Sequence, residues 1–207
     1  TLEEFYTICK KLTKDTNGDG QLDQFGSTEY TWKEALAANG GHLFQGGMLK
    51  LTTPEVKESL TFLQKLEDLN KNYKVSSKDF DQGKVAFYPM TLAQYRTYKP
   101  YPYHVSKYSN FTWTCIPMPA KSKTTKATLV TTTSFAMSAR SSHSKLAWEL
   151  MQLLTEDPEI QQTLFAQSQG ISVMPQVVKS RSSKDLLQVD DFGTDSLTNQ
   201  TLNRIME

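Results

Sequence analysis

Signals for the start of a helix recur along this sequence and divide its 207 residues into helical blocks joined by short linkers. Thr1-Leu-Glu-Glu4 has the spacing of a capping box, in which the Thr hydroxyl and the Glu carboxylate each accept a hydrogen bond from the other's backbone N–H. Thr53-Pro54-Glu55 and Asp157-Pro158-Glu159 place a capping oxygen directly before a proline at the first helical position. Apolar residues then follow at intervals of three and four, as in an amphipathic helix. The helices predicted from these starts span 1–13, 53–70 and 157–169.

Shorter elements of both kinds are predicted between these helices. Further helices are expected over 30–38, 76–83, 144–155 and 197–205, and strands over 84–88, 113–117 and 127–138. The helix at 144–155 is expected to turn four leucines inward: Leu146, Leu150, Leu153 and Leu154. Residues 15–27 are expected to form a loop, and 171–178 an extended segment around Pro175. Helices with a few strands between them place the chain in the α/β class.

The composition excludes several classes of protein. The chain has 23 Lys and Arg against 22 Asp and Glu, a net charge of +1, whereas a nucleic-acid-binding protein needs a surplus of positive charge. No apolar run approaches the roughly 18–20 residues that cross a bilayer, and no signal peptide is recognisable. Because the sequence opens on a helix start and stops inside a predicted helix, we expect it to be a piece of a longer protein. Cys9 and Cys115 are expected to be buried thiols, with a disulfide between them as the alternative.

Oxygen-bearing side chains alternate along the segment Asp15-Thr-Asn17-Gly-Asp19-Gly20-Gln21-Leu-Asp23. They take positions 1, 3, 5 and 9 of a loop with Gly at position 6, which is EF-hand spacing, and position 7 offers a backbone carbonyl. An EF-hand has a bidentate Glu at position 12, where this chain has Gly26, so Gln24 or a water would have to complete the shell. The alternative is a polar turn without a metal. The predicted structural Ca²⁺ site has these ligands: Asp15, Asn17, Asp19, Gln21, Asp23 and Gln24.

Aromatic side chains gather between residues 85 and 113, and the usual catalytic patterns are missing. Tyr and Trp combine a flat apolar face with a polar group, which suits the C–H faces and hydroxyls of sugar rings, although such residues can equally pack a loop or a core. The sequence has no Gly-x-Ser-x-Gly elbow and no Gly-x-x-x-x-Gly-Lys phosphate loop. The adjacent pair Asp190-Asp191 lacks the separation that glycoside hydrolysis requires. Binding is therefore better supported than catalysis.

A series of short motifs resembles the maltose-binding-like (family 1) extracellular solute-binding proteins of bacterial ABC importers. Each motif is weak alone, but their order and spacing over residues 1–178 make the resemblance specific. The motifs are Thr1–Leu12, Asp15–Gly26, Ala37–Gly41, Thr53–Leu60, Phe80–Phe87, Ala136–Ala139, Leu146–Glu149, Leu154–Glu159 and Gly170–Pro175.

The resemblance implies a periplasmic-binding-protein-like type II fold, helix-rich, with two α/β lobes and the ligand in the cleft between them. This chain is similar to the C-terminal half, so most of the first lobe would be missing. Residues 1–112 and 158–207 would belong to the second lobe. Residues 113–157 would give a strand and a helix to the first lobe and would expose apolar surface without it.

The implied function is binding of an extracellular sugar, an oligosaccharide, by hinge closure of the lobes, followed by delivery to the ABC transporter permease. The protein would be no enzyme and would have no nucleic-acid partner. The full-length protein is expected to be monomeric and extracellular, at the cell surface or in the periplasm, with a lipid anchor.

The family's ligand-facing positions carry over to residues in two stretches of this sequence. After the strand at 84–88 the family often has a Trp facing the ligand, but this chain has Met90-Thr91-Leu92-Ala93 there, so Tyr88 and Tyr95 are the nearest aromatic residues. Oligosaccharide-binding relatives also hold structural Ca²⁺ on a loop similar to 15–26. The predicted ligand-binding residues are Glu29, Tyr30, Trp32, Asn39, Gly40, Tyr88, Met90, Thr91 and Tyr95.

Two other classes of function stay open at this point. The first is a carbohydrate-active enzyme domain of the glycoside-hydrolase type, which would release cleavage products from a glycan. The second is a calcium-dependent interaction module, whose binding would be lost on chelation.

Overall fold

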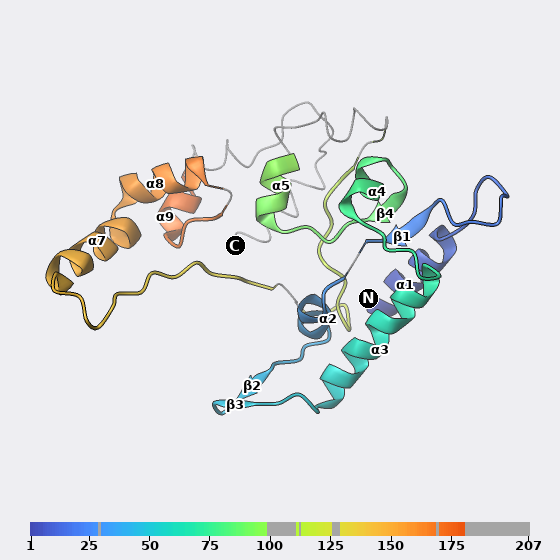
Figure 1. The fold of residues 1–207 in the computed structure, drawn as a ribbon, viewed down its shortest axis with the longest axis horizontal. Coiled ribbons are helices and arrows are strands. Elements are labelled where there is room, and N and C mark those ends of the chain that lie inside the picture. The colour runs from blue at the N-terminus through green and yellow to red at the C-terminus, as the bar shows by residue number, and fades with distance from the viewer. Residues whose placement is uncertain (29, 99–110, 112, 126–128, 169, 181–207) are drawn as a thin grey trace. The chain divides into compact units, whose positions relative to one another are not determined.

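The computed structural model describes residues 1–28, 30–98, 111, 113–125, 129–168 and 170–180. The chain divides into two compact units, which we describe separately: unit 1 comprises Thr1–Pro89, Tyr103–Phe111 and Pro117–Val130, and unit 2 comprises Met90–Pro102, Thr112–Ile116 and Thr131–Glu207. Unit 1 holds α1 (Leu2–Leu12), β1 (Phe25–Ser27), α2 (Trp32–Ala38), β2 (Phe44–Gln45), β3 (Met48–Leu49), α3 (Pro54–Leu69), α4 (Ser77–Asp81) and β4 (Val85–Phe87) (Figure 1). Unit 2 holds α5 (Leu92–Tyr98), α7 (Ser144–Glu156), α8 (Pro158–Gln167) and α9 (Pro175–Val178).

The three helix starts read from the sequence are confirmed. Thr1 Oγ1 accepts a hydrogen bond from Glu4 N (3.2 Å), and the Glu4 carboxylate completes the capping box. Thr53 caps α3, which has Pro54 in its first turn. Asp157 Oδ1 accepts from the backbone N–H groups of the second and third residues of α8 (2.9 and 3.0 Å). These contacts span three residues or fewer, which is why local sequence was sufficient to predict them.

The centre of unit 1 is a parallel pair of strands, β1 and β4, with α1 packed against it. Phe25 pairs with Val85 and Ser27 with Phe87. The loop predicted over 15–27 was therefore wrong for residues 25–27, which form β1. This strand is stabilised by pairing with the distant β4 rather than by its own sequence. The strand predicted at 84–88 and the short helix before it are confirmed as β4 and α4.

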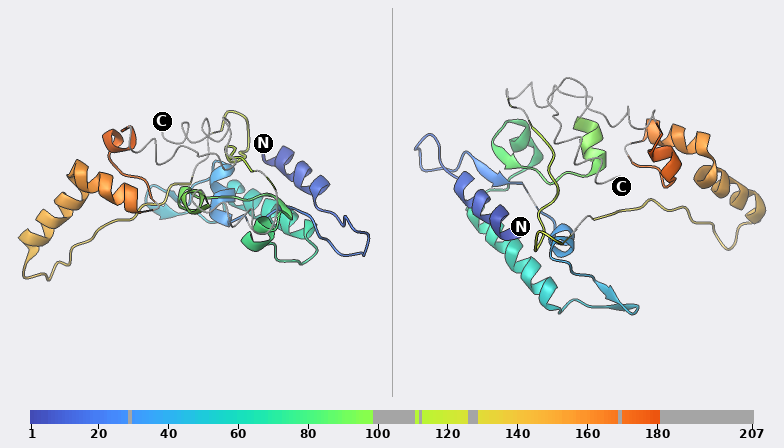
Figure 2. Two further views of the ribbon diagram at one scale, coloured as in Figure 1. Left: turned by 90° about the horizontal axis from the view of Figure 1, so that it is seen from above. Right: turned by 180° about the vertical axis from the view of Figure 1, so that it is seen from behind.

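A hydrophobic core lies between α1, α2 and α3. Its buried members are Phe5, Cys9, Tyr30, Ala35 and Leu66. Figure 2 shows α1 and α3 side by side. Cys9 is 1% exposed, and burial raises the pKa of its thiol to about 12, so the thiol is uncharged at neutral pH. Cys9 is therefore a buried thiol as predicted, whereas Cys115 is only half-buried. Within the described residues no disulfide joins the two.

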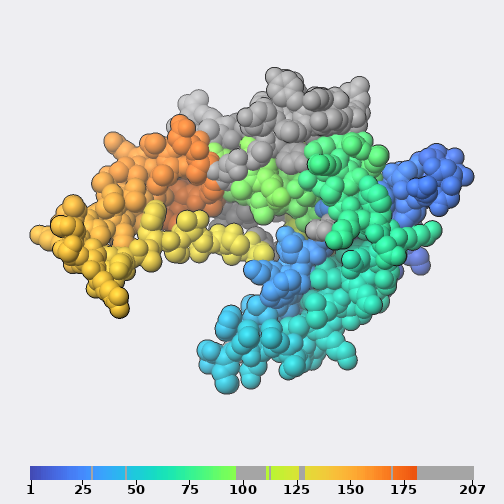
Figure 3. Space-filling model, in the orientation of Figure 1, coloured from blue at the N-terminus to red at the C-terminus, as the bar shows by residue number. Residues whose placement is uncertain are grey.

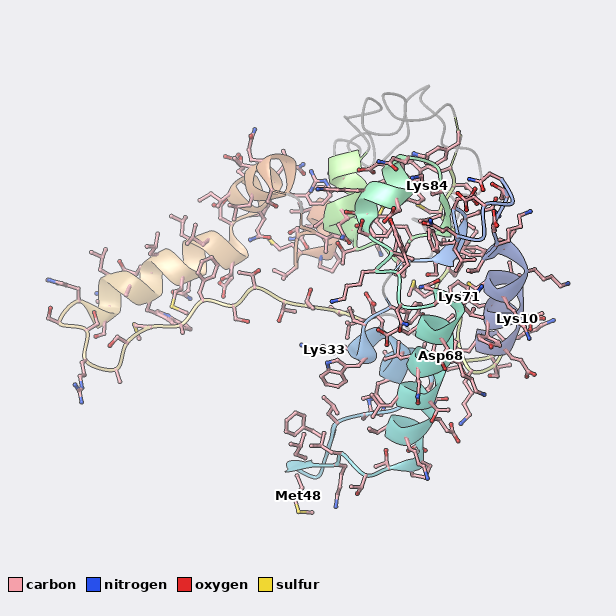
Figure 4. The ribbon with its side chains drawn as sticks, turned by 45° about the vertical axis from the view of Figure 1, so that its right-hand side comes forward. Lys10, Lys33, Met48, Asp68, Lys71 and Lys84 are labelled. Carbon is pink, nitrogen blue, oxygen red and sulfur yellow. The ribbon has the colours of Figure 1, made fainter. Side chains whose placement is uncertain are left out.

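The β2–β3 hairpin was not predicted. Phe44 pairs with Leu49 across a turn in which Gly46 and Gly47 have φ of +58° and +77°, values that glycine adopts without steric cost. The signal, Gly-Gly between apolar residues, is present in the sequence. Phe44 and Met48 are 66% and 60% exposed, and Figure 4 shows Met48 at the tip of the hairpin, projecting into open space.

Unit 2 has a small core between α5, α8 and α9. Phe165 and Val177 are 1% and 4% exposed, and Leu92 packs against them. The Arg96 guanidinium lies 4.8 Å from the centroid of the Phe165 ring and donates to the carbonyl of Gly170 (2.8 Å). Desolvation by burial lowers the pKa of Arg96, but its guanidinium remains charged.

Two segments of unit 2 differ from the prediction. Residues 171–178 were expected to be extended, but α9 begins at Pro175, a residue that suits the first turn of a helix. Helix α5 was missed, although Thr91 and Gln94 form a capping box at its start: Thr91 N donates to Gln94 Oε1 (2.8 Å) and Gln94 N donates to Thr91 Oγ1 (3.2 Å). The helix expected at 197–205 lies outside the described residues.

Helix α7 forms where it was predicted, but three of the four leucines expected to face inward are exposed, and the fourth, Leu154, is half-buried. Leu146, Leu150 and Leu153 are 66%, 52% and 47% exposed, and no residue of α7 is buried. The strands predicted at 113–117 and 127–138 are also absent from the described parts of those ranges. A strand requires a neighbouring strand to pair with, and in the described part of the chain neither segment has one. Figure 3 shows the segment after residue 131, in yellow, as a single extended thread of side chains leading to α7.

In the described part of the chain, no helix combines the length and the apolar character that a membrane span requires.

Candidate functional site

The carboxyl ends of β1 and β4 lie at one edge of the two-stranded sheet. Thr28 follows β1 and Tyr88 follows β4, and Thr28 N donates to the carbonyl of Phe87 (3.1 Å). In parallel α/β sheets, ligands bind outside the carboxyl ends of the strands. This edge is therefore the candidate site in unit 1.

Two buried hydroxyl groups, on residues that follow β1 in the chain, have no hydrogen-bond partner within the described residues. They are Thr28 Oγ1 and Tyr30 Oη, on residues that are 7% and 8% exposed. A buried hydroxyl without a partner costs about 1–3 kcal/mol, so such groups are rare in folded proteins and require an explanation. Hydroxyls that are left unpaired beside a strand end can bond to a polar ligand.

Tyr30 carries its hydroxyl on a ring that belongs to the core. The ring centroid lies 5.9 Å from that of Phe5 and 5.8 Å from that of Phe62, in an edge-on arrangement with the latter. Burial raises the pKa of Tyr30, and the charge of Glu34 adds to this, so the hydroxyl stays protonated and can donate. The ring itself is packed in the core, and the hydroxyl is its only polar group.

The other predicted ligand-binding residues of α2 lie at its two ends. Trp32 is 42% exposed, with Lys33 Nζ 5.8 Å from its ring. Asn39 is buried and donates its side-chain amide to Glu55 O (3.1 Å) and Glu58 Oε2 (3.0 Å), so it ties α2 to α3. Gly40 ends the helix with φ +76°, as its sequence predicts.

The remaining predicted positions are divided between the units. Tyr88, in unit 1, is half-buried against Phe80 (5.1 Å between centroids), and burial raises its pKa, with the charge of Asp81 adding to the effect. In unit 2, Met90 is half-buried, Thr91 caps α5 and Tyr95 is buried.

Tyr30 and Thr28 each have a buried hydroxyl without a partner among the described residues. The ligand-binding role of the predicted residues stays a prediction. Glu29 lies outside the described residues. Thr28 was not among the sequence-predicted positions. Thr28 could have been predicted as a site residue from its position directly after a strand. The strand itself, β1, could not be recognised in the sequence because it has only three residues and includes Gly26.

The 15–23 loop is held by short hydrogen bonds around its carboxylates. Asp15 accepts from the backbone N–H of Asn17 (3.1 Å), Gly18 (2.6 Å) and Gly20 (2.7 Å). Asp23 accepts from Thr16 Oγ1 (2.7 Å) and Thr16 N (2.9 Å), and these bonds, the hydroxyl first, lower the pKa of Asp23. Hydrogen bonds of this kind favour the ionised form of Asp23.

The ends of this loop are joined, but its acidic groups do not form a preassembled cage. An antiparallel bridge links Lys14 to Gln24, and Gln24 Nε2 donates to the carbonyl of Leu12 (2.8 Å), which anchors the loop to the end of α1. Among the described residues, no three His, Cys, Asp or Glu side chains gather as a metal site. The donor set of Asp, Asn and backbone oxygens suits a hard cation.

Comparison of the sequence with known protein families shows which family the chain belongs to. Residues 1–189 match the family described as bacterial extracellular solute-binding protein. The chain belongs to this family. The resemblance stated from the motifs is therefore confirmed, and membership places the protein outside the cytoplasm, in an extracellular or periplasmic location. No curated protein matches the sequence.

Two solved structures show the same fold. One is the maltose/maltodextrin-binding domain MalE from Bdellovibrio bacteriovorus bound to maltotriose, with a TM-score of 0.61 and 20% identity, covering 99% of this chain and 57% of that one. The other is the ABC substrate-binding protein Lmo0181 from Listeria monocytogenes in complex with cycloalternan, with a TM-score of 0.62 and 15% identity, covering 98% of this chain and 51% of that one. The type II binding-protein fold is thus confirmed, and the chain spans about half the length of these structures.

Proposed function

We propose that this solute-binding protein binds an oligosaccharide at the carboxyl edge of β1 and β4 and delivers it unaltered to an ABC transporter permease. The observation that carries the proposal is the pair of buried hydroxyls of Thr28 and Tyr30, which follow β1 in the chain and have no partner among the described residues. Sugar hydroxyls both donate and accept, so they can pair with such groups. The two neighbours in the fold were solved with oligosaccharides, which supports this class of ligand.

The proposal includes binding without catalysis, a lipid anchor, and a monomeric full-length protein that makes no contact with nucleic acid. The family supports the first of these, because its members are described as solute-binding proteins. Incubation with maltotriose and cycloalternan distinguishes binding from turnover: retention of intact sugar supports the proposal, and release of shorter products contradicts it.

The hydroxyls are tested by Tyr30→Phe and Thr28→Val, which remove one oxygen or exchange it for a methyl group of similar size. In the full-length protein, each should weaken binding of maltotriose or cycloalternan by about tenfold, since one hydrogen bond to the ligand contributes about 1–1.5 kcal/mol. The unliganded protein should lose no stability, because the lost hydroxyl had no partner. Thr7→Val, on the exposed face of α1, is the matched control. Unchanged affinity with reduced stability would show that the hydroxyls serve the fold instead.

We also propose that residues 113–157 belong to a different lobe from residues 1–112 and 158–207. The support is that α7 is amphipathic yet buries no residue, and that the segment before it is extended and has no partner strand among the described residues. A face of this kind normally packs against another element. Sedimentation of the 207-residue chain tests this: self-association that Leu150→Ser reduces supports an uncovered face, whereas a strictly monomeric chain contradicts it.

The 15–23 loop, finally, is proposed to hold a structural Ca²⁺ through the oxygens of Asp15, Asn17, Asp19, Asp23 and Gln24 and the carbonyl of Gln21. The support is the alternation of oxygen donors on a closed loop. Millimolar Ca²⁺ should raise the melting temperature of the chain and EDTA should reverse the increase, because a ligand that binds only the folded state stabilises it. Asp19→Asn should reduce the increase. Equal melting temperatures with Ca²⁺ and with EDTA would exclude an occupied site.

A further inference from the structure

The chain contains two Asn-Gly sequences, Asn17-Gly18 and Asn39-Gly40, in very different surroundings. At such a sequence the backbone nitrogen of Gly can attack the side-chain carbonyl carbon of Asn, because Gly has no Cβ to hinder the approach. The attack needs a side chain that can reorient, access for water, and backbone freedom at the Gly. These requirements separate the two sites.

Asn17 lies on the exposed 15–23 loop, and its neighbours polarise the atoms that would react. Asp19 N donates to Asn17 Oδ1 (2.9 Å), so this N–H would stabilise negative charge that develops on the oxygen during attack at Cγ. Gly18 N, the attacking nitrogen, donates to Asp15 Oδ1 at 2.6 Å, a charge-assisted hydrogen bond that increases its electron density. A Cβ built on Gly18 would meet nothing within 4 Å, so the turn has room to move.

Asn39, in contrast to Asn17, is buried, and its side chain is fixed by hydrogen bonds. It is 6% exposed, and its side-chain nitrogen donates to both Glu55 O and Glu58 Oε2. The N–H of Gly40 is bonded to the carbonyl of Ala37 (2.9 Å) in the last turn of α2. Attack there would require a buried side chain, bonded to two groups of α3, to reorient away from water, and it would disrupt the end of α2.

We propose that Asn17 is a site of spontaneous deamidation in the native protein and that Asn39 is protected by its fold. In the first step the bond from Gly18 N to Asn17 Cγ forms and the bond from Cγ to Nδ2 breaks. The proton of Gly18 N leaves with the amide nitrogen as ammonia, and a five-membered succinimide remains. Water then opens either carbonyl of the ring and gives aspartate or isoaspartate at position 17. The net change is one water consumed and one ammonia released.

Deamidation of Asn17 would change both the charge and the backbone length of the 15–23 loop. The amide Nδ2 of Asn17 donates to Asp19 Oδ2 (3.2 Å), and after deamidation a carboxylate would face that carboxylate instead. A loop that already carries Asp15, Asp19 and Asp23 would gain a further negative charge. Isoaspartate would also lengthen the backbone by one carbon within the turn.

The test follows both sites in one sample. The intact chain is incubated in EDTA at mildly alkaline pH, once native and once unfolded in urea, and digested. Mass spectrometry and an isoaspartate assay then give the rate at each position. In the native chain, product should accumulate at residue 17 and stay near background at residue 39, whereas in urea the two rates should become equal. Equal rates in the native chain, or faster reaction at Asn39, would overturn the proposal.

A matched variant tests the chemistry separately from the fold. Gly18→Ala adds a methyl group beside the attacking nitrogen and should greatly reduce product at Asn17, both native and in urea. Measuring in urea removes any effect of strain at the positive φ of residue 18 (+80°). If Gly18→Ala reacts as fast as the parent chain in urea, attack by Gly18 N is excluded.

Discussion

Helices α1 and α7 are amphipathic helices of similar length, with 11 and 13 residues, but only α1 lies against a core. Phe5 and Cys9 of α1 are buried under β1 and α3, whereas α7 exposes Leu146, Leu150 and Leu153. An apolar face shows that a helix requires a partner, but the face does not identify that partner. The difference between the two helices is therefore a difference in their surroundings.

The extended segments show the same contrast more sharply. The three residues of β1 include a glycine and carry no alternating pattern, yet they form a buried strand because β4 pairs with them. The described residues 129–138 include Val130 and three consecutive threonines, residues typical of strands, and form no strand. Strand propensity expresses how well a side chain fits a pleated surface, so it has little effect where no such surface is present.

The broadest test of this contrast is amide hydrogen exchange. Amides in the middle of α1 and α3 should exchange only on global unfolding, which for a domain costs about 5–15 kcal/mol. Amides of α7 should exchange through local opening at a small fraction of that free energy, because no buried contact opposes the opening. Equal protection in α1 and α7 would show that α7 is covered after all.

A pair of truncations within unit 2 compares α7 with the adjacent helix. Phe165→Ala, in α8, should cost about 3–5 kcal/mol of unfolding free energy, since Phe165 is 1% exposed. Leu150→Ala, in α7, should change it by less than about 0.5 kcal/mol. Urea unfolding followed by fluorescence and circular dichroism measures both. A large loss for Leu150→Ala would contradict the exposure of the α7 face.

Two glycine substitutions compare a close contact in unit 1 with an open position in unit 2. A Cβ on Gly26 would lie 2.4 Å from Cys9 Cα, so Gly26→Ala should push α1 away from β1 and cost about 2–3 kcal/mol. Gly170→Ala meets only Ser168 Oγ, at 3.7 Å, and should be within about 0.5 kcal/mol of the parent. Equal urea midpoints for the two variants would show that α1 and β1 adjust without cost.

The smallest effect concerns Asp79, whose carboxylate joins α4 to the chain before it. Burial alone would raise the pKa of Asp79, but hydrogen bonds from Ser76 N, Ser76 Oγ (both 2.8 Å) and Tyr73 Oη (2.9 Å) lower it below its ordinary value. The folded pKa is the lower one, so its contribution is complete above the ordinary Asp pKa and is lost as pH falls through the folded value. Asp79→Asn should cost about 1.5 kcal/mol at neutral pH. The difference from the parent chain should shrink in acid, and a difference that is independent of pH would exclude this account.

The sequence by itself determined the features that depend on neighbouring residues. The caps at Thr1, Thr53 and Asp157 and the termination of α2 at Gly40 each involve contacts over a few positions, so the residue types sufficed to predict them. The ordered motifs also sufficed to identify the solute-binding family, because they record the order of elements along the chain.

Only the tertiary structure decided which faces are buried and which polar groups lack partners. Residues distant in sequence meet where β1 pairs with β4 and where Gly26 approaches Cys9. Contacts of this kind also bury the hydroxyls of Thr28 and Tyr30, which have no partner among the described residues. Leu146, Leu150 and Leu153 of α7 were predicted to be core residues and are exposed in the fold. Burial is a property of what surrounds a residue in space, and a hydrophobic pattern along one helix does not contain that information.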